Sequence, residues 1–182
     1  MTASFCIRSE HNPNHRHFNI ELCGGTILDI GIYNIFLSLY LFGKPEKVSA
    51  SAVLDIQGGD NSASYSFVNS DGSLSVMHSS FMASDPYITA EIQGTKGKIV
   101  LEHRWFFPGN IIIKYTNGEK RRLKFKTKCN GYEFQAEEVA QCINEGKLQS
   151  SKWSWSDSLL LAESMDVVRE KCGVFYPAHD KL

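Results

Sequence analysis

The chain has 182 residues, 42% of them hydrophobic and 12% aromatic, which suffices for one domain built around a single apolar core. Its 19 basic and 20 acidic side chains leave a net charge of −1. This balance excludes a highly charged disordered chain and gives no indication of nucleic-acid binding. We therefore expect one globular domain over residues 1–182, with no nucleic-acid partner.

The longest apolar run, residues 27–42, is interrupted by Asp29, Asn34 and Ser38 and is shorter than the ~20 apolar residues that span a bilayer. Met1 is not followed by the basic and apolar regions of a secretory signal. The five cysteines are odd in number and show no C-x-x-C spacing, which favours free thiols over disulfides or a metal site. We expect a cytoplasmic protein with no membrane contact and no bound metal.

The first part of the chain fits a strand, a loop and a helix. Residues 3–8 fit a short strand, and the polar segment 9–19 fits a loop because it is rich in Asn, Pro and Ser. A helix then begins near Thr26 and ends at Gly43. It is apolar nearly all round, which is typical of a buried helix. Asp29 needs a charged or hydrogen-bonding partner in such a place.

Apolar and polar residues alternate from Val48 to about residue 125, a period typical of half-buried strands. The expected strands are 48–56, 62–68, 73–81, 86–93, 98–102, 110–115 and 119–126. Segments rich in turn-forming residues separate several of them, at 69–72, 82–85, 94–97 and 116–119. Strands at this spacing predict a large, mainly antiparallel sheet.

Helical periodicity returns in the last third of the chain. The apolar residues that share a helix face are Ala136, Val139, Ala140 and Ile143 in 132–145, and Leu161, Met165, Val168 and Cys172 in 157–172. The order of elements predicts an α+β fold, in which a mixed, mainly antiparallel sheet has helices covering one face.

Asp29 and Tyr33 stand four positions apart, so both side chains project from one face of the helix. One hypothesis is proton transfer, in which Tyr33 exchanges its hydroxyl proton with a substrate and Asp29 orients the reacting groups. The alternative is structural: Thr26 and Asp29 match a capping box, and Tyr33 is a core tyrosine with a satisfied hydroxyl. Spacing alone favours the structural alternative, because capping boxes are commoner than catalytic pairs.

Two other polar groups have plainer interpretations. His11, His15 and His17 lie in the polar loop, where we expect them to face solvent, since no nearby acid or thiol completes a metal site. Basic side chains alternate on one face of a late strand, as in an outer strand protected from aggregation. These are Lys120, Arg122, Lys124, Lys126 and Lys128.

Three consecutive aromatic residues, Trp105, Phe106 and Phe107, separate two of the expected strands. They fit two roles equally well: capping one end of the core, or forming the apolar wall of a small-molecule site. The chain contains no G-x-G-x-x-G or P-loop turn that would receive a nucleotide phosphate.

One face of the expected sheet is rich in small, weakly polar side chains, whereas a solvated antiparallel face more commonly carries Lys, Glu and Arg. The residues assigned to it are Ser49, Ser51, Val53, Ser62, Ser64, Ser66, Ser73, Ser75, Ser79 and Thr89. We predict a homodimer that pairs through this face, which the helices leave open. The alternative is a serine-rich face that meets water.

The stretch CGGTILDIGIYNIFLSLYLFGKPEKVSA, residues 23–50, resembles the C-terminal domain of the Gfo/Idh/MocA oxidoreductase family. LDIGIY within it is most similar to the dimeric dihydrodiol dehydrogenase-like branch. EIQGTKGKIVL, residues 91–101, and SLLLAESMDVVREKCGVFYP, residues 158–177, extend the resemblance over nearly the whole chain. It implies a glyceraldehyde-3-phosphate dehydrogenase-like C-terminal fold, pairing through the sheet, and hydride transfer between NAD(P) and a CH–OH group of a sugar, polyol or diol.

The resemblance also assigns site residues. Asp29 falls on the family's active-site aspartate, and Tyr33 falls on a position that is histidine in inositol dehydrogenase-like members and tyrosine in the dihydrodiol branch. Tyr33 would then give or take the hydroxyl proton at a cleft between domains, with Asp29 nearby. Trp105 falls on an aromatic that lines the substrate pocket, and Phe106 is assigned to the same wall.

The family's Rossmann domain, with its glycine-rich turn and its E-K-P lysine, has no counterpart in these residues. We therefore expect the chain alone to bind neither NAD nor NADP and to be inactive, as a fragment of a longer enzyme or a truncated gene product. The interpretation we adopt is the substrate-binding and dimerisation domain of an NAD(P)-dependent oxidoreductase. The rival is a free-standing binding or assembly module that has lost the enzymatic role.

Overall fold

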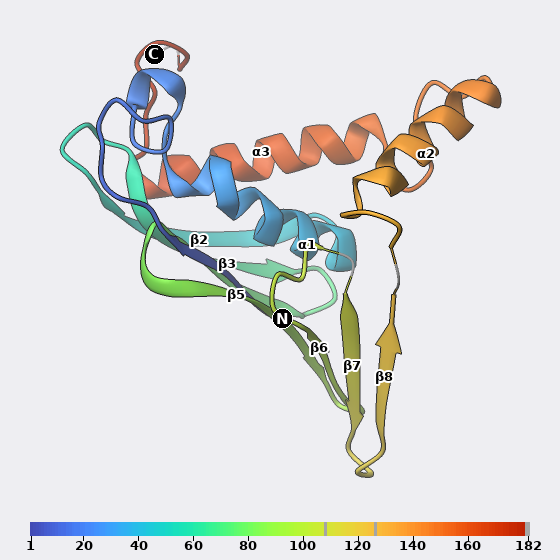
Figure 1. The fold of residues 1–182 in the computed structure, drawn as a ribbon. Coiled ribbons are helices and arrows are strands. Elements are labelled where there is room, and N and C mark those ends of the chain that lie inside the picture. The colour runs from blue at the N-terminus through green and yellow to red at the C-terminus, as the bar shows by residue number, and fades with distance from the viewer. Residues whose placement is uncertain (108, 126, 181–182) are drawn as a thin grey trace.

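The computed structural model describes residues 1–107, 109–125 and 127–180, which form an eight-stranded sheet with helices on one side (Figure 1). The strands are β1 (Thr2–Arg8), β2 (Pro45–Leu54), β3 (Asp60–Asn69), β4 (Leu74–Ser80), β5 (Met82–Gly94), β6 (Gly97–Leu101), β7 (Asn110–Tyr115) and β8 (Lys120–Lys124). The helices are α1 (Ile32–Phe42), α2 (Tyr132–Asn144) and α3 (Trp155–Cys172). A 3-10 turn at Ile20–Leu22 and a π-helical turn at Ile27–Gly31 precede α1.

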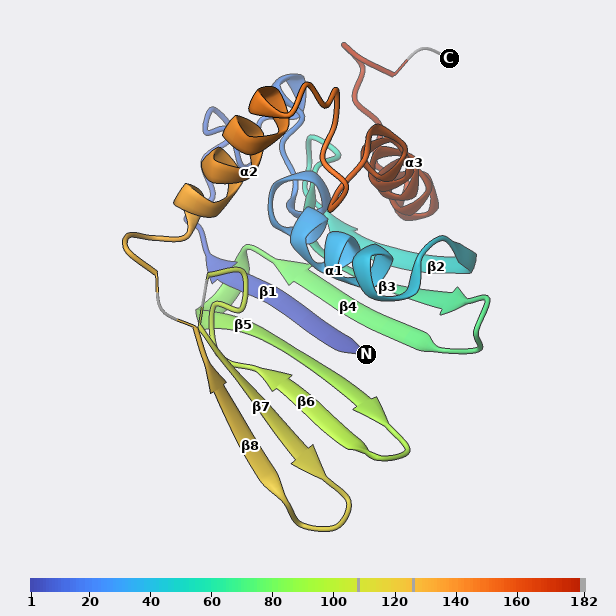
Figure 2. The same cartoon turned by 90° about the vertical axis from the view of Figure 1, so that its right-hand side faces the viewer.

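The strand order is β2-β3-β4-β1-β5-β6-β7-β8. Only the β1–β4 pair among these neighbours is parallel, and the others are antiparallel. The N-terminal strand β1 lies between β4 and β5 (Figure 2). The connection from β4 to β5, at Phe81, therefore crosses the C-terminal end of β1. There the Ser9 N–H donates to the Phe81 carbonyl at 2.9 Å. The α+β class and the mixed, mainly antiparallel sheet are confirmed.

The turns expected from glycine, asparagine and aspartate are present at 69–72, 94–97 and 116–119, but the turn expected at 82–85 is not. Those four residues instead open strand β5, where Met82 pairs with Arg8 of β1. Local composition favoured a turn, but pairing with the N-terminal strand β1 holds the start of this segment in an extended conformation.

The core lies between the sheet and the helices α1 and α3. Fully buried apolar side chains include Ile27, Ile35, Phe67, Met77 and Val168. By length and composition the helical stretch Ile20–Phe42, with a mean hydropathy of 1.5, is apolar enough to cross a membrane, but 61% of its apolar window is buried inside the protein. The packing of this helix on the sheet therefore accounts for most of its apolar surface.

Helix α3 has the capped ends and the core-facing stripe of a stable helix. Ser154 and Asp157 form a reciprocal capping box at its start, and Gly173 ends it in the left-handed conformation. Of the expected stripe, Val168 is fully buried, and Leu161, Met165 and Cys172 are half-buried. The apolar spacing thus gave the correct face of α3.

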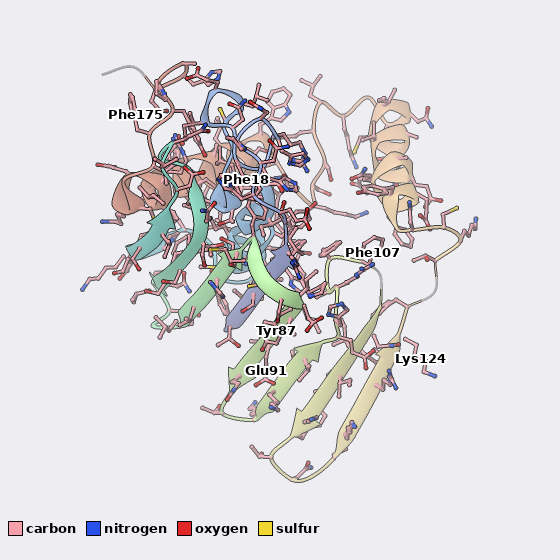
Figure 3. The ribbon with its side chains drawn as sticks, turned by 60° about the vertical axis from the view of Figure 1, so that its left-hand side comes forward. Phe18, Tyr87, Glu91, Phe107, Lys124 and Phe175 are labelled. Atoms are coloured by element: carbon pink, nitrogen blue, oxygen red, sulfur yellow. The ribbon has the colours of Figure 1, made fainter. Side chains whose placement is uncertain are left out.

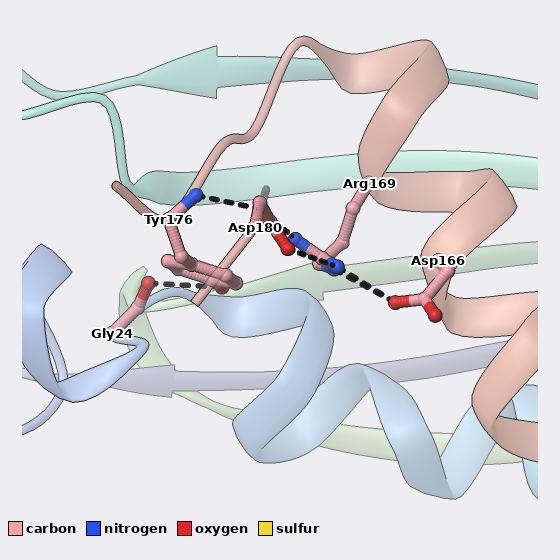
Figure 4. A network of polar contacts seen from close by, with 5 residues as sticks. All are labelled: Gly24, Asp166, Arg169, Tyr176 and Asp180. Atoms are coloured by element: carbon pink, nitrogen blue, oxygen red, sulfur yellow. Dashed lines mark hydrogen bonds and ion pairs between the residues drawn. The ribbon is translucent and has the colours of Figure 1, made fainter. Parts of the chain in front are cut away.

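The segment after α3 is fastened to the domain by a polar network (Figure 4). The Arg169 guanidinium contacts Asp166 at 2.7 Å and Asp180 at 2.9 Å, and it lies over the Tyr176 ring at 4.8 Å. The Tyr176 hydroxyl donates to the Gly24 carbonyl at 3.3 Å. This last bond ties the C-terminal segment to the loop in front of the π-helical turn, which begins three residues after Gly24.

Helix α2 does not cover the sheet and lies to one side of the α1 and α3 layer (Figures 1 and 2). Of its expected stripe, Val139 is 58% exposed and Ile143 is 70% exposed, while Cys142 is the residue of this helix that is buried. The expected cover of helices on one sheet face is therefore provided by α1 and α3, whereas the apolar stripe of α2 is largely exposed. Apolar spacing correctly identified the helix but did not show where it packs.

The face of the sheet opposite the helices is open. In the register of β2, β3 and β4, Ser64 lies between Ser51 and His78. Apolar side chains are exposed on this face too, among them Val53, Val76 and Tyr87. Figure 3 labels Tyr87 and Glu91 on β5, which lie in this surface. The face is therefore less polar than its serines alone suggested.

Two serines assigned to the open face lie on the helix side instead. Ser75 and Ser79 are both completely buried. The Ser38 hydroxyl of α1 donates to the Ser75 oxygen at 2.8 Å, and the hydroxyls of Ser79 and Thr26 are 2.9 Å apart. The assignment of these two residues was wrong because buried serines satisfied by a helix partner look like solvated serines in a sequence.

Strand β8 is an edge strand, as its alternating basic residues predicted. Lys120, Arg122 and Lys124 lie on it (Lys124 is labelled in Figure 3), and Arg122 contacts Glu102 at 2.7 Å. Lys128 lies beyond the end of the strand, and Lys126 lies outside the described residues.

The five cysteines are free thiols in the structure. Cys6 and Cys142 are buried, and Cys129 is exposed. Burial raises the pKa of the Cys6 thiol and raises that of Cys172 to about 11. These two side chains therefore stay protonated near neutral pH and act as packing groups rather than nucleophiles.

Candidate active site

A cavity of about 1330 Å³ opens beside the start of α1 and is bordered by the segment after β6, the first turn of α2 and the loop before α3. Aromatic side chains form much of its wall: Tyr33, Phe36, Tyr40, Trp105, Phe106, Phe107, Phe125, Phe134 and Trp153. Polar side chains at its border are Asp29, Glu102, His103, Arg104, Asn110 and Lys152. A mostly apolar cavity with a few polar groups is the usual form of a small-molecule site.

Asp29 and Tyr33 both border this cavity, so the fold brings the two predicted site residues together. Asp29 lies in the π-helical turn Ile27–Gly31, and Tyr33 lies in the first turn of α1. Single π-helical turns within helices frequently occur at functional sites. Tyr33 is 39% exposed, which does not fit a tyrosine enclosed by the core.

The Tyr33 ring is held by two phenylalanines. Its centroid is 5.3 Å from that of Phe5 and 5.2 Å from that of Phe106, and these two rings stack on each other at 5.0 Å. Burial raises the pKa of Tyr33, and the Tyr132 phenol and the Asp29 carboxylate raise it further. Tyr33 therefore keeps its proton at neutral pH.

The carboxylate of Asp29 has a basic side chain beside each oxygen. Arg16 Nη1 donates to Asp29 Oδ1 at 2.5 Å, and His17 Nε2 lies 3.6 Å from Asp29 Oδ2. Both partners come from the loop before the helix, where sequence spacing gave no sign of them.

Asp60, not Asp29, caps the helix, so the predicted capping box is wrong. Thr26 does stand at the N-cap, but its hydroxyl donates to Asp60 Oδ2 at 2.5 Å, and the Ile27 N–H donates to the same oxygen at 2.9 Å. Asp60 begins strand β3, far from Thr26 in sequence. Asp29 is thereby left free to face the cavity.

Asp60 is completely buried, and its Oδ1 has no hydrogen-bond partner among the described residues. Burial raises its pKa from the usual 3.8 to about 6, against the opposing effect of its hydrogen bonds from Thr26 and Ile27. Gly25, with φ +137, lets the carboxylate approach, since a Cβ there would stand 2.2 Å from Oδ1.

His17 is not the solvent-facing residue that the loop composition predicted. Its side chain is 15% exposed, its ring stacks on Phe81 at 4.7 Å, and its Nδ1 lies 2.8 Å from the Ser9 hydroxyl. His11 and His15 are exposed, as expected. The described residues include no group of three or more His, Cys, Asp or Glu placed to hold a metal ion.

The aromatic residues after β6 fill both roles that the sequence left open. Phe106 packs against the buried cluster that contains Phe5 and also lines the cavity. Trp105 packs against both buried clusters and lines the same cavity, and its indole N–H is buried without a partner in the described part of the chain. Phe107 lies at the outer end of this segment (Figure 3).

Residues 1–100 match the family model described as the GFO/IDH/MocA C-terminal domain. The chain is 33% identical to the scyllo-inositol 2-dehydrogenase (NADP(+)) of Bacillus subtilis strain 168, with 98% of this chain and 55% of that protein covered. It is 34% identical to the trans-1,2-dihydrobenzene-1,2-diol dehydrogenase of Xenopus tropicalis, with 86% and 49% covered. The chain thus spans about half the length of these relatives.

Solved structures show the same fold at lower identity. A UDP-N-acetylglucosamine 3-dehydrogenase from Acidithiobacillus ferrooxidans has a TM-score of 0.78 at 15% identity, with 96% of this chain and 53% of that chain covered. A levoglucosan dehydrogenase in complex with NADH and levoglucosan has a TM-score of 0.77 at 19% identity, with 97% and 58% covered. Since the family model covers more than half of the chain and the relatives in sequence extend over nearly all of it, the chain belongs to the Gfo/Idh/MocA family, whose C-terminal domain it contains.

Proposed function

We propose that this chain is the substrate-binding and dimerisation domain of an NAD(P)-dependent oxidoreductase that acts on a CH–OH group of a sugar, polyol or diol. The observation that carries the proposal is the meeting of Asp29 and Tyr33 at one apolar cavity of about 1330 Å³. The relatives named as dehydrogenases of scyllo-inositol and of a dihydrobenzenediol support the reaction class. A second, nucleotide-binding half would be the domain's partner, since these relatives are about twice as long.

In this proposal Tyr33 is the proton donor and acceptor. A bound nicotinamide would supply or accept the hydride. In the reduction direction, the Tyr33 phenol gives its proton to the carbonyl oxygen while the carbonyl carbon gains the hydride. In the oxidation direction, the Tyr33 phenolate that the reverse step leaves accepts the hydroxyl proton of the substrate as the carbon loses the hydride. Asp29 stabilises the protonated phenol, because its negative charge raises the pKa of Tyr33.

The aromatic wall gives the substrate its orientation and keeps water away. Trp105 and Phe106 would lie against the carbon skeleton of the substrate, with Phe106 already stacked on Phe5 and therefore held in place. Excluding water strengthens the electrostatic effect of Asp29 on Tyr33, because charges interact more strongly in a medium of low dielectric constant.

We predict that the chain alone binds neither NAD nor NADP. A dinucleotide pyrophosphate is typically received by a free helix N-terminus that follows a glycine-rich turn. Here the glycine pair Gly24–Gly25 does precede a helical turn, but Asp60 already accepts from the Thr26 hydroxyl and the Ile27 N–H at its start. Calorimetric titration with each nucleotide should show no binding at micromolar concentration. A low-micromolar dissociation constant for either one would contradict the assignment of this chain to the substrate side.

We also predict a homodimer through the open sheet face, where Ser51 pairs with Ser64 and the exposed apolar Val76 pairs with Ser66. A stable interface buries at least about 1,000 Å² in total and keeps the dimer intact at micromolar concentration. Ser64→Arg places a long charged side chain on this face, in the second strand from the β2 edge, and should convert the dimer to a monomer. The measurement is mass by light scattering.

The control is Ser70→Arg, which adds the same charge in the exposed turn between β3 and β4 and should leave the dimer intact. A wild-type mass of one chain would exclude the dimer. A dimer that persists in Ser64→Arg would move the interface to another surface.

A further inference from the structure

The loop between β1 and the first helical turns makes two contacts with the same carboxylate. Arg16 Nη1 lies 2.5 Å from Asp29 Oδ1, and His17 Nε2 lies 3.6 Å from Asp29 Oδ2. The first contact is a charge-assisted hydrogen bond, and the second is a close electrostatic contact that is longer than a hydrogen bond. Consecutive residues of one loop therefore approach the two oxygens of the acid that borders the cavity.

His17 is the better fixed of the two basic residues. Its ring is enclosed by Phe81 and bonded to the Ser9 hydroxyl, whereas the Arg16 side chain is mostly exposed. When the Ser9 hydroxyl donates to Nδ1, the ring proton of a neutral His17 is on Nε2, which points toward Asp29. The neutral imidazole then presents its N–H toward the carboxylate, at a distance longer than a hydrogen bond.

We propose that Arg16 and His17 are positioning residues that hold the Asp29 carboxylate in place for proton transfer at Tyr33. The inference rests on the proposed function of Tyr33. Asp29 does not cap the helix, because Asp60 does so, and the loop supplies the contacts that fix its orientation. A carboxylate so held keeps its negative charge beside the phenol, whereas a freely rotating one would spend part of its time turned toward solvent.

The charged groups that face His17 determine how its titration reports on this arrangement. Burial lowers the pKa of His17, Asp29 raises it, and Arg16 and His15 lower it. Asp29→Asn should therefore lower the pKa of His17 further, and Arg16→Gln should raise it. Both shifts follow from the charge that each substitution removes.

The first test is an NMR titration of the histidines in this chain, which requires no enzymatic activity. Asp29→Asn and Arg16→Gln should move the His17 titration in opposite directions. His11, which lies in the same loop but faces Asp55 at 3.8 Å, is the internal control and should not move. A His17 titration that is unchanged by both substitutions would overturn the proposed arrangement.

The second test is steady-state kinetics of the chain joined to its nucleotide-binding half. Arg16→Gln and His17→Gln should each lower kcat by about tenfold with a much smaller change in KM, while Arg16→Lys recovers most of the rate because it keeps the charge. His11→Gln is the matched control. In an Asp29→Asn background the two losses should disappear, because their effect passes through Asp29.

The positioning role would be overturned if Arg16→Gln and His17→Gln still lowered kcat to the full extent in the Asp29→Asn background. Wild-type kcat in the single variants would overturn it as well. Failure of the proposed function would appear separately, as wild-type turnover in a Tyr33→Phe variant or as no turnover in the joined protein. In the latter case the histidine titration still decides whether the loop holds Asp29.

Discussion

Replacing Tyr33 by phenylalanine should lower kcat by ~10² to 10⁴, the usual cost of losing a positioned proton donor, in a protein that joins this chain to a nucleotide-binding half. The substitution removes the hydroxyl but keeps the ring that packs between Phe5 and Phe106, so the cavity wall and the fold should remain. Nucleotide affinity should change little, because it depends on the other half. Turnover and nucleotide affinity are measured on the same preparation.

Tyr115→Phe is the matched control, since it removes a hydroxyl on β7 while the ring below Arg121 stays. It should leave turnover unchanged. Wild-type turnover in Tyr33→Phe would return Tyr33 to a packing role. Asp29→Asn is also informative, because Asp60 caps the helix and the substitution changes the charge at the cavity without uncapping it.

The periodicity of the sequence was sufficient to predict most of the sheet. Alternating strands separated by glycine-rich and asparagine-rich turns were recognised correctly where pairing is local, as in the β5–β6 hairpin, in which Gly94 pairs with Gly97. The prediction failed at residues 82–85, because the pairing of Met82 with Arg8 depends on the insertion of β1 between β4 and β5. Long-range pairing of this kind leaves no local signal.

Which face a serine occupies could not be predicted from its polarity. In β4 the exposed side chains include the apolar Leu74 and Val76, whereas Ser75 and Ser79 are buried. The hydroxyls of Ser38 and Thr26 on the facing helical segment satisfy these two serines, so their burial carries little penalty. Only the docking of that helix on the sheet makes these bonds available, and it joins residues far apart in sequence.

The catalytic and substrate-binding roles of the site residues stay predictions, and the structure shows only where these residues lie. Asp29, Tyr33, Trp105 and Phe106 all border the cavity, and the first two were found by spacing and resemblance together. The surroundings of Asp29 were not found, because His17 lies in a segment whose composition indicates only a loop. A close histidine–carboxylate contact between a loop and a helical turn has no fixed spacing.

The second large effect concerns Asp60, whose buried carboxylate should make the domain less stable as the pH rises. Its pKa is raised from 3.8 to about 6 by burial, so between these values the folded state binds more protons than the unfolded state. Linkage then requires the free energy of unfolding to fall with rising pH across this window. A difference of about 2 between the folded and unfolded pKa values of Asp60 corresponds to about 3 kcal/mol. Ionisation of Asp60 should therefore lower the free energy of unfolding by roughly that much between pH 3 and pH 7.

Asp60→Asn should abolish this component, because an amide oxygen still accepts from Thr26 and Ile27 but does not titrate. The measurement is urea unfolding of wild type and Asp60→Asn at several values between pH 4 and pH 7.5.

Other carboxylates also titrate in this range of pH. Those whose pKa is lowered, such as Asp180 beside Arg169, change the free energy of unfolding in the opposite sense, but they do so equally in wild type and Asp60→Asn. Asp71→Asn is the control of opposite sign, because hydrogen bonds from Ser73 lower the pKa of Asp71. Parallel pH profiles for wild type and Asp60→Asn would show that Asp60 titrates alike in the folded and unfolded states, and that its burial beneath the helix carrying Asp29 and Tyr33 has no electrostatic cost.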